Sequence, residues 1–165
     1  MSIQCRKMTA SDWMSVAEIY KQGIDTGNAT FQQTVPTREE WDHNHAACCR
    51  IVAEVDNVIA GWAALSPVSG RAVYSGVAEV SVYVGNEYRG QQIGKKLLES
   101  IIHESECNGY WTLQSGILTE NSASIALHKK SGFREIGYRE KVAKMNNVWR
   151  NTILFERRSI VTGME

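Results

Sequence analysis

The sequence lacks the features that would indicate a membrane protein, a disulfide-rich secreted protein or a metal site. It has no apolar run of membrane-spanning length, and its first residues, MSIQCRKMTASDW, lack the apolar core of a signal peptide. Its four cysteines form no C-x-x-C pair, and the adjacent Cys48 and Cys49 do not suit a normal disulfide. His43 and His45 are two residues apart, on different faces of a helix, and no cluster of metal ligands is visible. We therefore predict a soluble cytoplasmic protein with no metal.

An excess of charge of either sign is also lacking. Lys plus Arg and Asp plus Glu both number 18, so the formal net charge is zero and a uniformly basic nucleic-acid surface is not expected. An anionic ligand would have to be held by a local device. There are only two prolines, no repeat and no linker-like stretch among the 165 residues. We expect one domain over residues 1–165, with no nucleic-acid or membrane partner.

The order of the periodic segments predicts an α/β (α+β) chain. Two β-rich runs precede an alternation of strands and helices, and two β-rich runs close the chain, which indicates a mixed sheet with helices on both faces. Asp12, Thr37 and Asn121 are expected to cap helices, with Thr37 and Glu40 forming a capping box. Asp56-Asn57 reads as a tight hairpin turn. The expected strands cover 3–7, 50–55, 58–65, 77–84, 111–118, 134–144 and 148–157.

The most informative stretch runs from Ala78 to Lys95, where a strand leads into a glycine-bearing turn and then a helix. Successive backbone amides in such a turn converge on one point and, with the positive end of the helix, form an anion cradle. Neither G-x-x-x-x-G-K-[ST] nor G-x-G-x-x-G is present. The glycine spacing alone is weak evidence, since an ordinary strand-to-helix turn would look the same.

Two motifs in this order make the chain resemble the GCN5-related N-acetyltransferases. RGQQIGKKLL is similar to the acyl-CoA pyrophosphate motif Q/R-x-x-G-x-G/A, with Gln91 first and Gln92 in place of the middle glycine. NSASIALHKKSGF, from Asn121 to Phe133, resembles the second signature, N-x-x-A-x-x-x-Y-x-x-x-G-F. The resemblance covers nearly the whole chain and implies that family's fold, with a mostly antiparallel sheet.

The resemblance narrows to the phosphinothricin and methionine sulfoximine acetyltransferases. It is carried by Asn28-Ala29-Thr30-Phe31, by Arg71-x-x-Tyr74, by the strand of residues 77–84, by Asn121 with Leu127-His128 and by Trp149. It implies a homodimer, direct transfer from acetyl-CoA as co-substrate, and a small α-amino acid or analogue as acceptor.

The resemblance also implies how acetyl-CoA would be held. The backbone along the strand would hydrogen-bond the pantetheine arm as an added strand does, and the following turn would cradle the pyrophosphate. Asn121 has two compatible roles, capping its helix and contacting the cofactor. The residues expected to bind acetyl-CoA are Val82, Tyr83, Val84, Arg89, Gly90, Gln91, Gln92, Ile93, Gly94, Lys95, Asn121 and Ser124.

Glu79 is the expected general base, because a carboxylate in a partly dry cleft can accept a proton from an ammonium directly or through water. Read alone, it would be an ordinary solvent-facing strand glutamate. His128 stands where many relatives carry a tyrosine considered to protonate the leaving thiolate, and the alternative is a packed helix histidine.

The acceptor is expected to be gripped by Arg71 and Tyr74, because Arg suits bidentate recognition of a carboxylate or phosphinate. Thr30 and Phe31 would line the same pocket, and so would Trp149, although a tryptophan is more often in a core or an interface. Two rival functions stay open at this point. One is a catalytically silent CoA-binding regulatory module, and the other is an acetyltransferase for peptide or protein amino termini.

Overall fold

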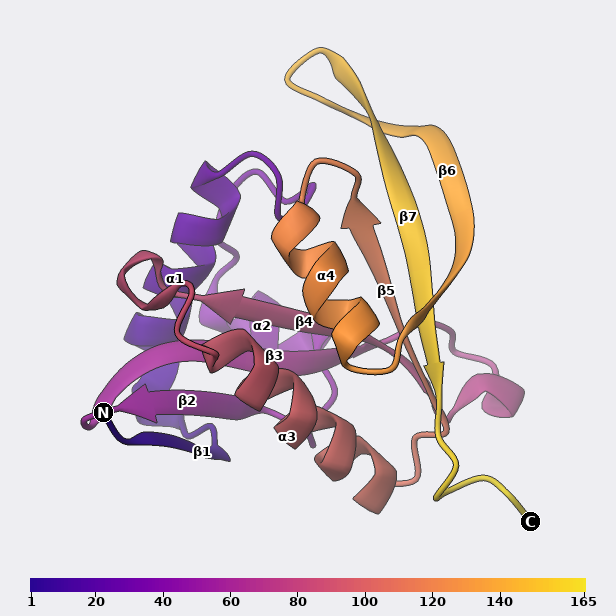
Figure 1. Ribbon diagram of the computed structural model, residues 1–165, viewed down its shortest axis with the longest axis horizontal. Helices are drawn as coiled ribbons and strands as arrows, with labels where there is room; N and C mark the ends of the chain where they lie inside the picture. Colours follow the sequence, from indigo (N-terminus) through magenta and orange to yellow (C-terminus); the bar gives the residue numbers. More distant parts are fainter.

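Seven strands form one sheet in the computed structural model, which describes residues 1–165 (Figure 1). The strand order is β1-β2-β3-β4-β5-β7-β6, and every neighbouring pair is antiparallel except β4–β5. The predicted mixed, mostly antiparallel sheet is confirmed. The strands are β1 (Ile3–Lys7), β2 (Ile51–Val55), β3 (Val58–Pro67), β4 (Val77–Val84), β5 (Thr112–Leu118), β6 (Arg134–Met145) and β7 (Val148–Arg158).

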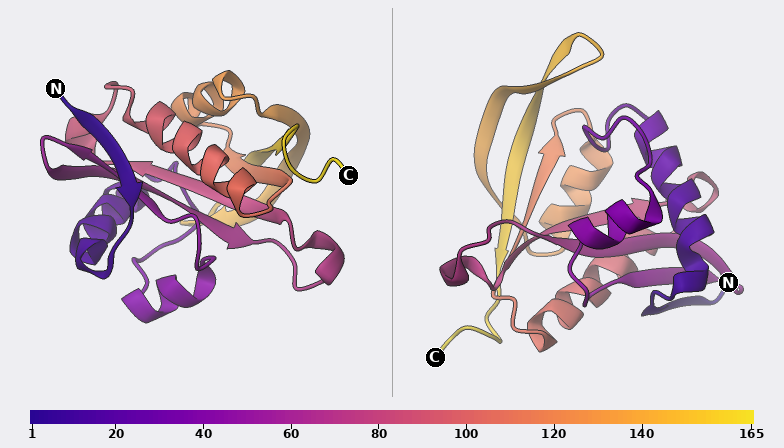
Figure 2. Two further views of the ribbon diagram at one scale, coloured as in Figure 1. Left: turned by 90° about the horizontal axis from the view of Figure 1, so that it is seen from below. Right: turned by 180° about the vertical axis from the view of Figure 1, so that it is seen from behind.

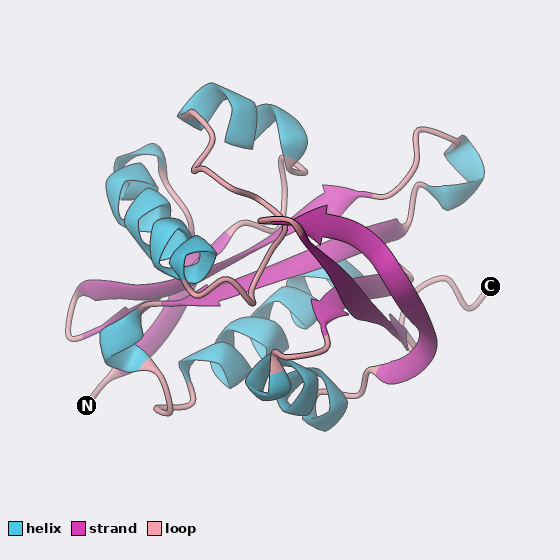
Figure 3. Cartoon of the chain, turned by 90° about the horizontal axis from the view of Figure 1, so that it is seen from above, coloured by secondary structure: helices cyan, strands magenta, loops and turns pink.

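Helices cover both faces of this sheet, as expected (Figures 2 and 3). The helices α1 and α2 lie on one face, and α3 and α4 lie on the other. No helix is both long enough and apolar enough to cross a bilayer. The α-helices are α1 (Trp13–Asp25), α2 (Arg38–Asn44), α3 (Ile93–Cys107) and α4 (Ser122–Lys130), and short 3₁₀ turns occupy Ala10–Asp12, Ala72–Tyr74 and Asn86–Tyr88.

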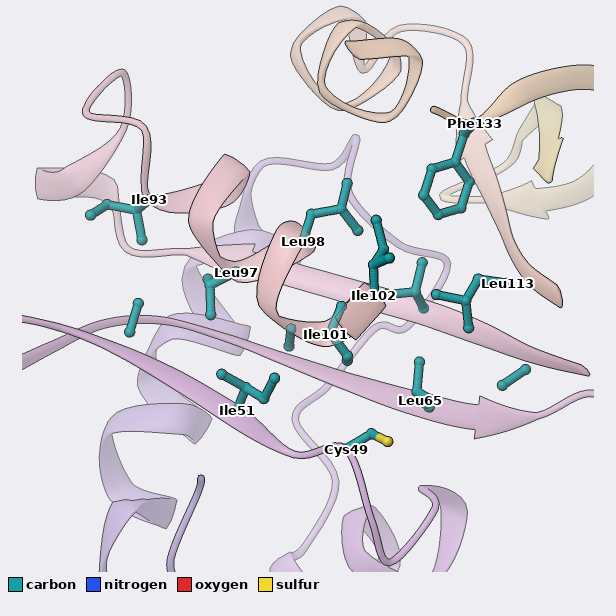
Figure 4. Packing of buried hydrophobic residues seen from close by; sticks show 14 of the residues in the cluster. Cys49, Ile51, Leu65, Ile93, Leu97, Leu98, Ile101, Ile102, Leu113 and Phe133 are labelled. Carbon is teal, nitrogen blue, oxygen red and sulfur yellow. The ribbon is translucent and has the colours of Figure 1, made fainter. Parts of the chain in front are cut away.

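The larger core lies between α3 and the sheet (Figure 4). Leu97, Leu98 and Ile101 from α3 are fully buried against strand residues such as Leu65 and Phe155. Their spacing places them on one helical face, which is why this segment folds as a helix on the sheet. This packing fixes the start of α3 at the end of β4.

A smaller, aromatic core lies under α1 and α2. Trp62 of β3 is fully buried there, and Trp41 of α2 packs edge-on to it at 5.6 Å between ring centroids. Tyr83 of β4 stacks on Trp62 at 4.8 Å. Because Trp62 and Tyr83 are opposite each other in the β3–β4 register, the stack is a cross-strand pair. This core holds one face of β4 in place.

Local sequence signals account for most element boundaries. Asp56 and Asn57 both have positive φ, as the tight turn between β2 and β3 requires. At α2 the predicted capping box is confirmed, since the Thr37 hydroxyl accepts from the amide of Glu40 while the Glu40 carboxylate accepts from the amide of Thr37. Asn121 caps α4 by accepting from the amide of Ser124 at 3.2 Å.

The prediction that Asp12 caps the first helix with its side chain is wrong. Its carboxylate does not bond to the first-turn amides of α1. It accepts two hydrogen bonds from the Arg6 guanidinium and one from the amide of Thr9 at 2.7 Å. Arg6 lowers the pKa of Asp12 by this hydrogen bonding. A buried ion pair with β1 has taken the place of the cap because Arg6 lies within reach.

The site is positioned by the way β4 and β5 part. They pair over three positions only, Val77 with Thr112, Ala78 with Leu113 and Glu79 with Gln114. Beyond Glu79 the two strands diverge, and in Figure 1 β4 and β5 run in clearly different directions. The other edge of β4 pairs with β3 along its whole length. The β5-facing edge of β4 after Glu79 therefore has no strand partner.

Candidate active site

A cleft of about 1510 Å³ opens where β4 and β5 part, and we call it the strand cleft. Most of its lining comes from the loop of residues 26–36 between α1 and α2 (the 26–36 loop), β4, the turn of residues 88–95, β5 and α4, and a few residues of α1, α2, β3 and β7 complete it. Strand and helix segments make up most of the lining, so its shape is set by the sheet and by the two helices packed on it. A cleft of this size and mixed lining suits an extended organic ligand with a second, smaller one.

The floor of the strand cleft is the free edge of β4. Val82, Tyr83 and Val84 all line it, as predicted for the residues along this strand. Free N–H and C=O groups on a strand edge bind an extended chain that carries amide groups. This edge has the chemistry to hold a pantetheine arm.

The turn after β4 has the backbone conformation that an anion cradle requires. Gly90 has φ of 75° and Gln92 has φ of 68°, both left-handed, and α3 begins immediately after Gln92. No side chain caps the first-turn amides of α3. Those amides and the positive end of the helix are therefore available to a phosphate.

Gly94 has a different reason to be small. A Cβ at this position would lie 3.2 Å from Cδ2 of Leu127, so the glycine allows α3 and α4 to pack closely.

Gln92, which replaces the expected middle glycine, adopts the left-handed conformation as a non-glycine residue. Gln91 lies outside the cleft lining and donates from its side chain to the carbonyl oxygen of Glu87 at 3.0 Å. Arg89 and Lys95 line the cleft near this turn.

Glu79 stands at the last paired position of β4, at the mouth of the strand cleft. Its side chain is exposed, yet the protein atoms around it displace enough water to raise its pKa. A hydrogen bond from Gln114 and the charge of Arg139 oppose that shift. A carboxylate with a raised pKa that solvent still reaches can take a proton and pass it to water. The geometry allows Glu79 the predicted role of a base.

Next to Glu79 on the same face of β4 is a group of hydroxyls. Tyr83 has polar contacts with the hydroxyls of Tyr20 and Thr30, and burial raises its pKa. The Tyr20 pKa is raised for the same reason. Both phenols are therefore protonated at neutral pH and can act as hydrogen-bond donors. Thr30 and Phe31, predicted to contact the acceptor, line this part of the strand cleft.

His128 lies on the α4 wall of the strand cleft and is only 3 % exposed. Its Nδ1 is 2.7 Å from the carbonyl oxygen of Ser124, so this nitrogen carries the ring proton. Burial lowers the pKa of His128, which keeps the ring neutral. Its Nε2 is buried without a hydrogen-bond partner. Nε2 is therefore an acceptor in the neutral ring, and protonation of the departing thiolate by His128 would need the imidazolium form.

Three residues predicted to contact the acceptor lie away from the strand cleft in this chain. Arg71 and Tyr74 are in the exposed loop between β3 and β4, where the guanidinium lies over the Tyr74 ring at 5.6 Å. Trp149 is 54 % exposed beside the turn between β6 and β7. None of the three lines the cleft. Their contact with an acceptor would need a loop movement or a second copy of the chain.

The structure adds residues that sequence reasoning missed. Gln114 and Arg139 both bear on the pKa of Glu79. Tyr20 adds a third hydroxyl to those of Tyr83 and Thr30. Gln114 could have been found from its place on a strand parallel to β4, had the register been known. Arg139 borders an irregularity in the β6–β7 pairing, which no sequence pattern indicates.

No three His, Cys, Asp or Glu side chains are grouped as a metal site would require. A family model described as "Acetyltransferase (GNAT) family" matches residues 13–133. The chain belongs to the GNAT acetyltransferase family. The open β4 edge and the left-handed turn at the start of α3 are the two features that the sequence resemblance led us to expect of an acetyl-CoA site.

Individual relatives agree with this family assignment. The chain is 26% identical over 159 residues to a phosphinothricin N-acetyltransferase of Streptomyces viridochromogenes, covering 94% of this chain and 87% of the relative. A phosphinothricin acetyltransferase of Sinorhizobium meliloti solved with AcCoA has a TM-score of 0.88 and 26% identity, over 100% of this chain and 92% of that one. A ribosomal-protein-alanine N-acetyltransferase from Brucella melitensis has a TM-score of 0.88 and 28% identity, over 94% and 99%.

Proposed function

We propose that this protein transfers the acetyl group of acetyl-CoA to the amino group of a small amino acid or analogue of the phosphinothricin or methionine sulfoximine type, by direct attack within a ternary complex. One observation carries the proposal. Glu79 stands where β4 leaves β5, and the free strand edge that follows it lines the same cleft as Tyr83, Tyr20 and Thr30 with their hydroxyls. A donor and an acceptor held in one cleft react with an advantage of several kcal/mol from positioning alone.

The residues present fit acetyl-CoA as co-substrate. The edge from Val82 to Val84 would pair with its pantetheine arm, and the amides of residues 90–95 would cradle its pyrophosphate, with Arg89 and Lys95 adding positive charge. Asn121 and Ser124 at the start of α4 line the opposite wall. When bound, acetyl-CoA supplies the thioester carbonyl that the amine attacks.

The acceptor would lie on the hydroxyl side of Glu79. Its ammonium group must lose a proton before it can attack, and Glu79 is the carboxylate on this face that can take it. The uncharged donors Tyr20, Tyr83 and Thr30 can orient polar atoms of the acceptor without opposing its charge. Residues of the 26–36 loop line this part of the cleft.

The test is a panel of amines assayed for free CoA release and for acetylated product by mass spectrometry. Methionine sulfoximine, phosphinothricin and plain amino acids form the first group. Acetylation of at least one of them, dependent on Glu79, is the expected result. Tight acetyl-CoA binding with no acetylation of any amine would contradict the proposal and favour a catalytically silent CoA-binding module.

An acetyltransferase for peptide amino termini is a second candidate, because the similar Brucella melitensis structure is named for a ribosomal-protein alanine substrate. Peptides with an amino-terminal alanine therefore belong in the same panel. If kcat/KM for such a peptide exceeded that for every amino acid, the acceptor class would be a peptide. The position of Phe31 in the cleft lining favours the smaller acceptor.

A cytoplasmic location and a homodimer are also part of the proposal. The four cysteines are all free, which suits a reducing compartment. The homodimer follows from the resemblance to the phosphinothricin group. Sedimentation at several protein concentrations tests it directly.

A further inference from the structure

Arg150 of β7 joins two rims of the strand cleft without lining it. Its Nη1 donates to the carbonyl oxygen of Gly27 at 2.8 Å, and its Nη2 donates to Oδ1 of Asn28 at 2.7 Å and to Oε2 of Glu120 at 3.1 Å. The side chain is 13% exposed. Glu120 immediately precedes Asn121, the cap of α4. One guanidinium therefore ties the 26–36 loop to the turn that begins the α4 wall.

The 26–36 loop has few other attachments. Its first residues, Thr26 and Gly27, bond back to the end of α1. No backbone hydrogen bond joins residues 28–36 to the rest of the protein, and their other side-chain hydrogen bonds stay within the loop. Apart from Arg150, the polar attachments of this segment are the contacts of Thr30 with Tyr20 and Tyr83, and Ala29, Phe31 and Val35 are half-buried.

The contacts of Arg150 suit a residue that holds one loop conformation. Gly27 has φ of 73°, so its carbonyl is presented by a left-handed turn that few other residues adopt. A guanidinium donates in a fixed planar fork, which fixes the direction of each acceptor as well as its distance. Glu120 is half exposed and brings a negative charge to the partly buried cation. The loop is thus oriented by a rigid donor as well as by the packing of its half-buried residues.

We propose that Arg150 is a positioning residue that holds the 26–36 loop against the Glu120–Asn121 turn and thereby sets the affinity for the acceptor. Asn28, Thr30 and Phe31 line the strand cleft on the acceptor side. Loss of the guanidinium frees this rim, whereas the β4 edge and the turn of residues 88–95 keep their conformations. The inference rests on the proposed function, because it assigns the 26–36 loop to the acceptor.

The experiment compares wild type with Arg150→Gln and Arg150→Lys in steady-state kinetics with both substrates. We expect Arg150→Gln to raise the acceptor KM about tenfold, as loss of a charge-assisted hydrogen bond does, and to leave the acetyl-CoA Kd within about twofold. The acceptor KM of Arg150→Lys, which keeps the positive charge but not the planar fork of donors, should lie between those of wild type and Arg150→Gln. Arg134→Gln is the matched control, since it breaks a different ion pair, Arg134 of β6 with Glu156 of β7, which does not involve the loop.

Chymotryptic cleavage after Phe31, followed by mass spectrometry, reports the loop directly. Cleavage there should be faster in Arg150→Gln than in wild type and unchanged in the control. An unchanged acceptor KM, an acetyl-CoA Kd that rises in parallel, or unchanged cleavage would overturn the inference. If Arg150→Gln does not fold, Arg150→Lys decides by the same criteria. If wild type acetylates no amine, the proposed function fails, and cleavage after Phe31 alone decides whether Arg150 holds the loop.

Discussion

Replacement of Glu79 by Gln tests the proposed chemistry most directly. The amide keeps the size of the side chain and can still contact Gln114, so the fold should change little. Loss of a general base typically costs about 10²- to 10⁴-fold in rate. Because solvent reaches this position, water can replace part of the function, and we expect the lower end, about 100-fold in kcat/KM. That corresponds to about 2.7 kcal/mol of transition-state stabilisation.

The pH dependence should change as well. Burial raises the pKa of Glu79 above the ordinary 4.5, and only the ionised carboxylate can accept a proton. In the wild type, kcat/KM should therefore fall as the pH falls through that raised pKa. Glu79→Gln has no carboxyl to titrate, so this acidic limb should disappear from its profile.

The assay is the initial rate of CoA release at saturating acetyl-CoA, with the acetyl-CoA Kd from calorimetry. Glu87→Gln is the control, because it removes an exposed carboxylate a few residues further along that does not line the strand cleft. Glu79→Gln with activity within threefold of wild type, or with the acidic limb retained, would refute the assignment of the base.

Three further outcomes are expected. Tyr83→Phe should raise the acceptor KM about 3- to 10-fold by loss of one hydrogen bond and leave the acetyl-CoA KM unchanged; a change in the acetyl-CoA KM alone would contradict its placement. Because the folded state lowers the pKa of His128, the neutral ring contributes to stability above about pH 6.5, and this contribution is lost as the pH falls below that value. His128→Phe has no imidazole ring to protonate, so the decline of its Tm towards pH 5 should be flatter than that of wild type. Gly76→Ala would put a Cβ 2.1 Å from Trp111 and should cost about 1–3 kcal/mol, whereas Gly137→Ala, which meets nothing within 4 Å, should leave Tm nearly unchanged in the same thermal melts.

The sequence was most informative where structure is set locally. The strand of residues 77–84 was predicted with the boundaries that the structure shows, because Val80, Val82 and Val84 alternate with polar residues. The capping box at Thr37 needs only residues three apart, and it forms as expected. Motifs of this kind place the glycine-bearing turn between β4 and α3 correctly because strand, glycine and helix start are consecutive.

What the sequence could not supply is long-range. The point at which β4 and β5 part depends on the register between strands that are separated by α3, and this register puts Gln114 beside Glu79. Arg150 is likewise far in sequence from Gly27 and Glu120, its partners. The expected cap at Asp12 failed over a shorter separation, because Arg6, six residues earlier in β1, competes for its carboxylate. Such contacts arise from tertiary packing, and no periodicity reports them.

Because β4 and β5 pair over a short length, the sheet consists of two parts, here called leaves, that are joined by only a few paired residues. The leaf of β1–β4 and the leaf of β5–β7 meet through three residue pairs beside Glu79. A ligand bound in the strand cleft would contact both leaves and hold them together. At a hundredfold excess over its Kd it would contribute about 2.7 kcal/mol to stability. Deuterium exchange at the amides of residues 80–84 should then slow together with exchange in β5, so cofactor loading would be visible as a stiffening of the whole sheet.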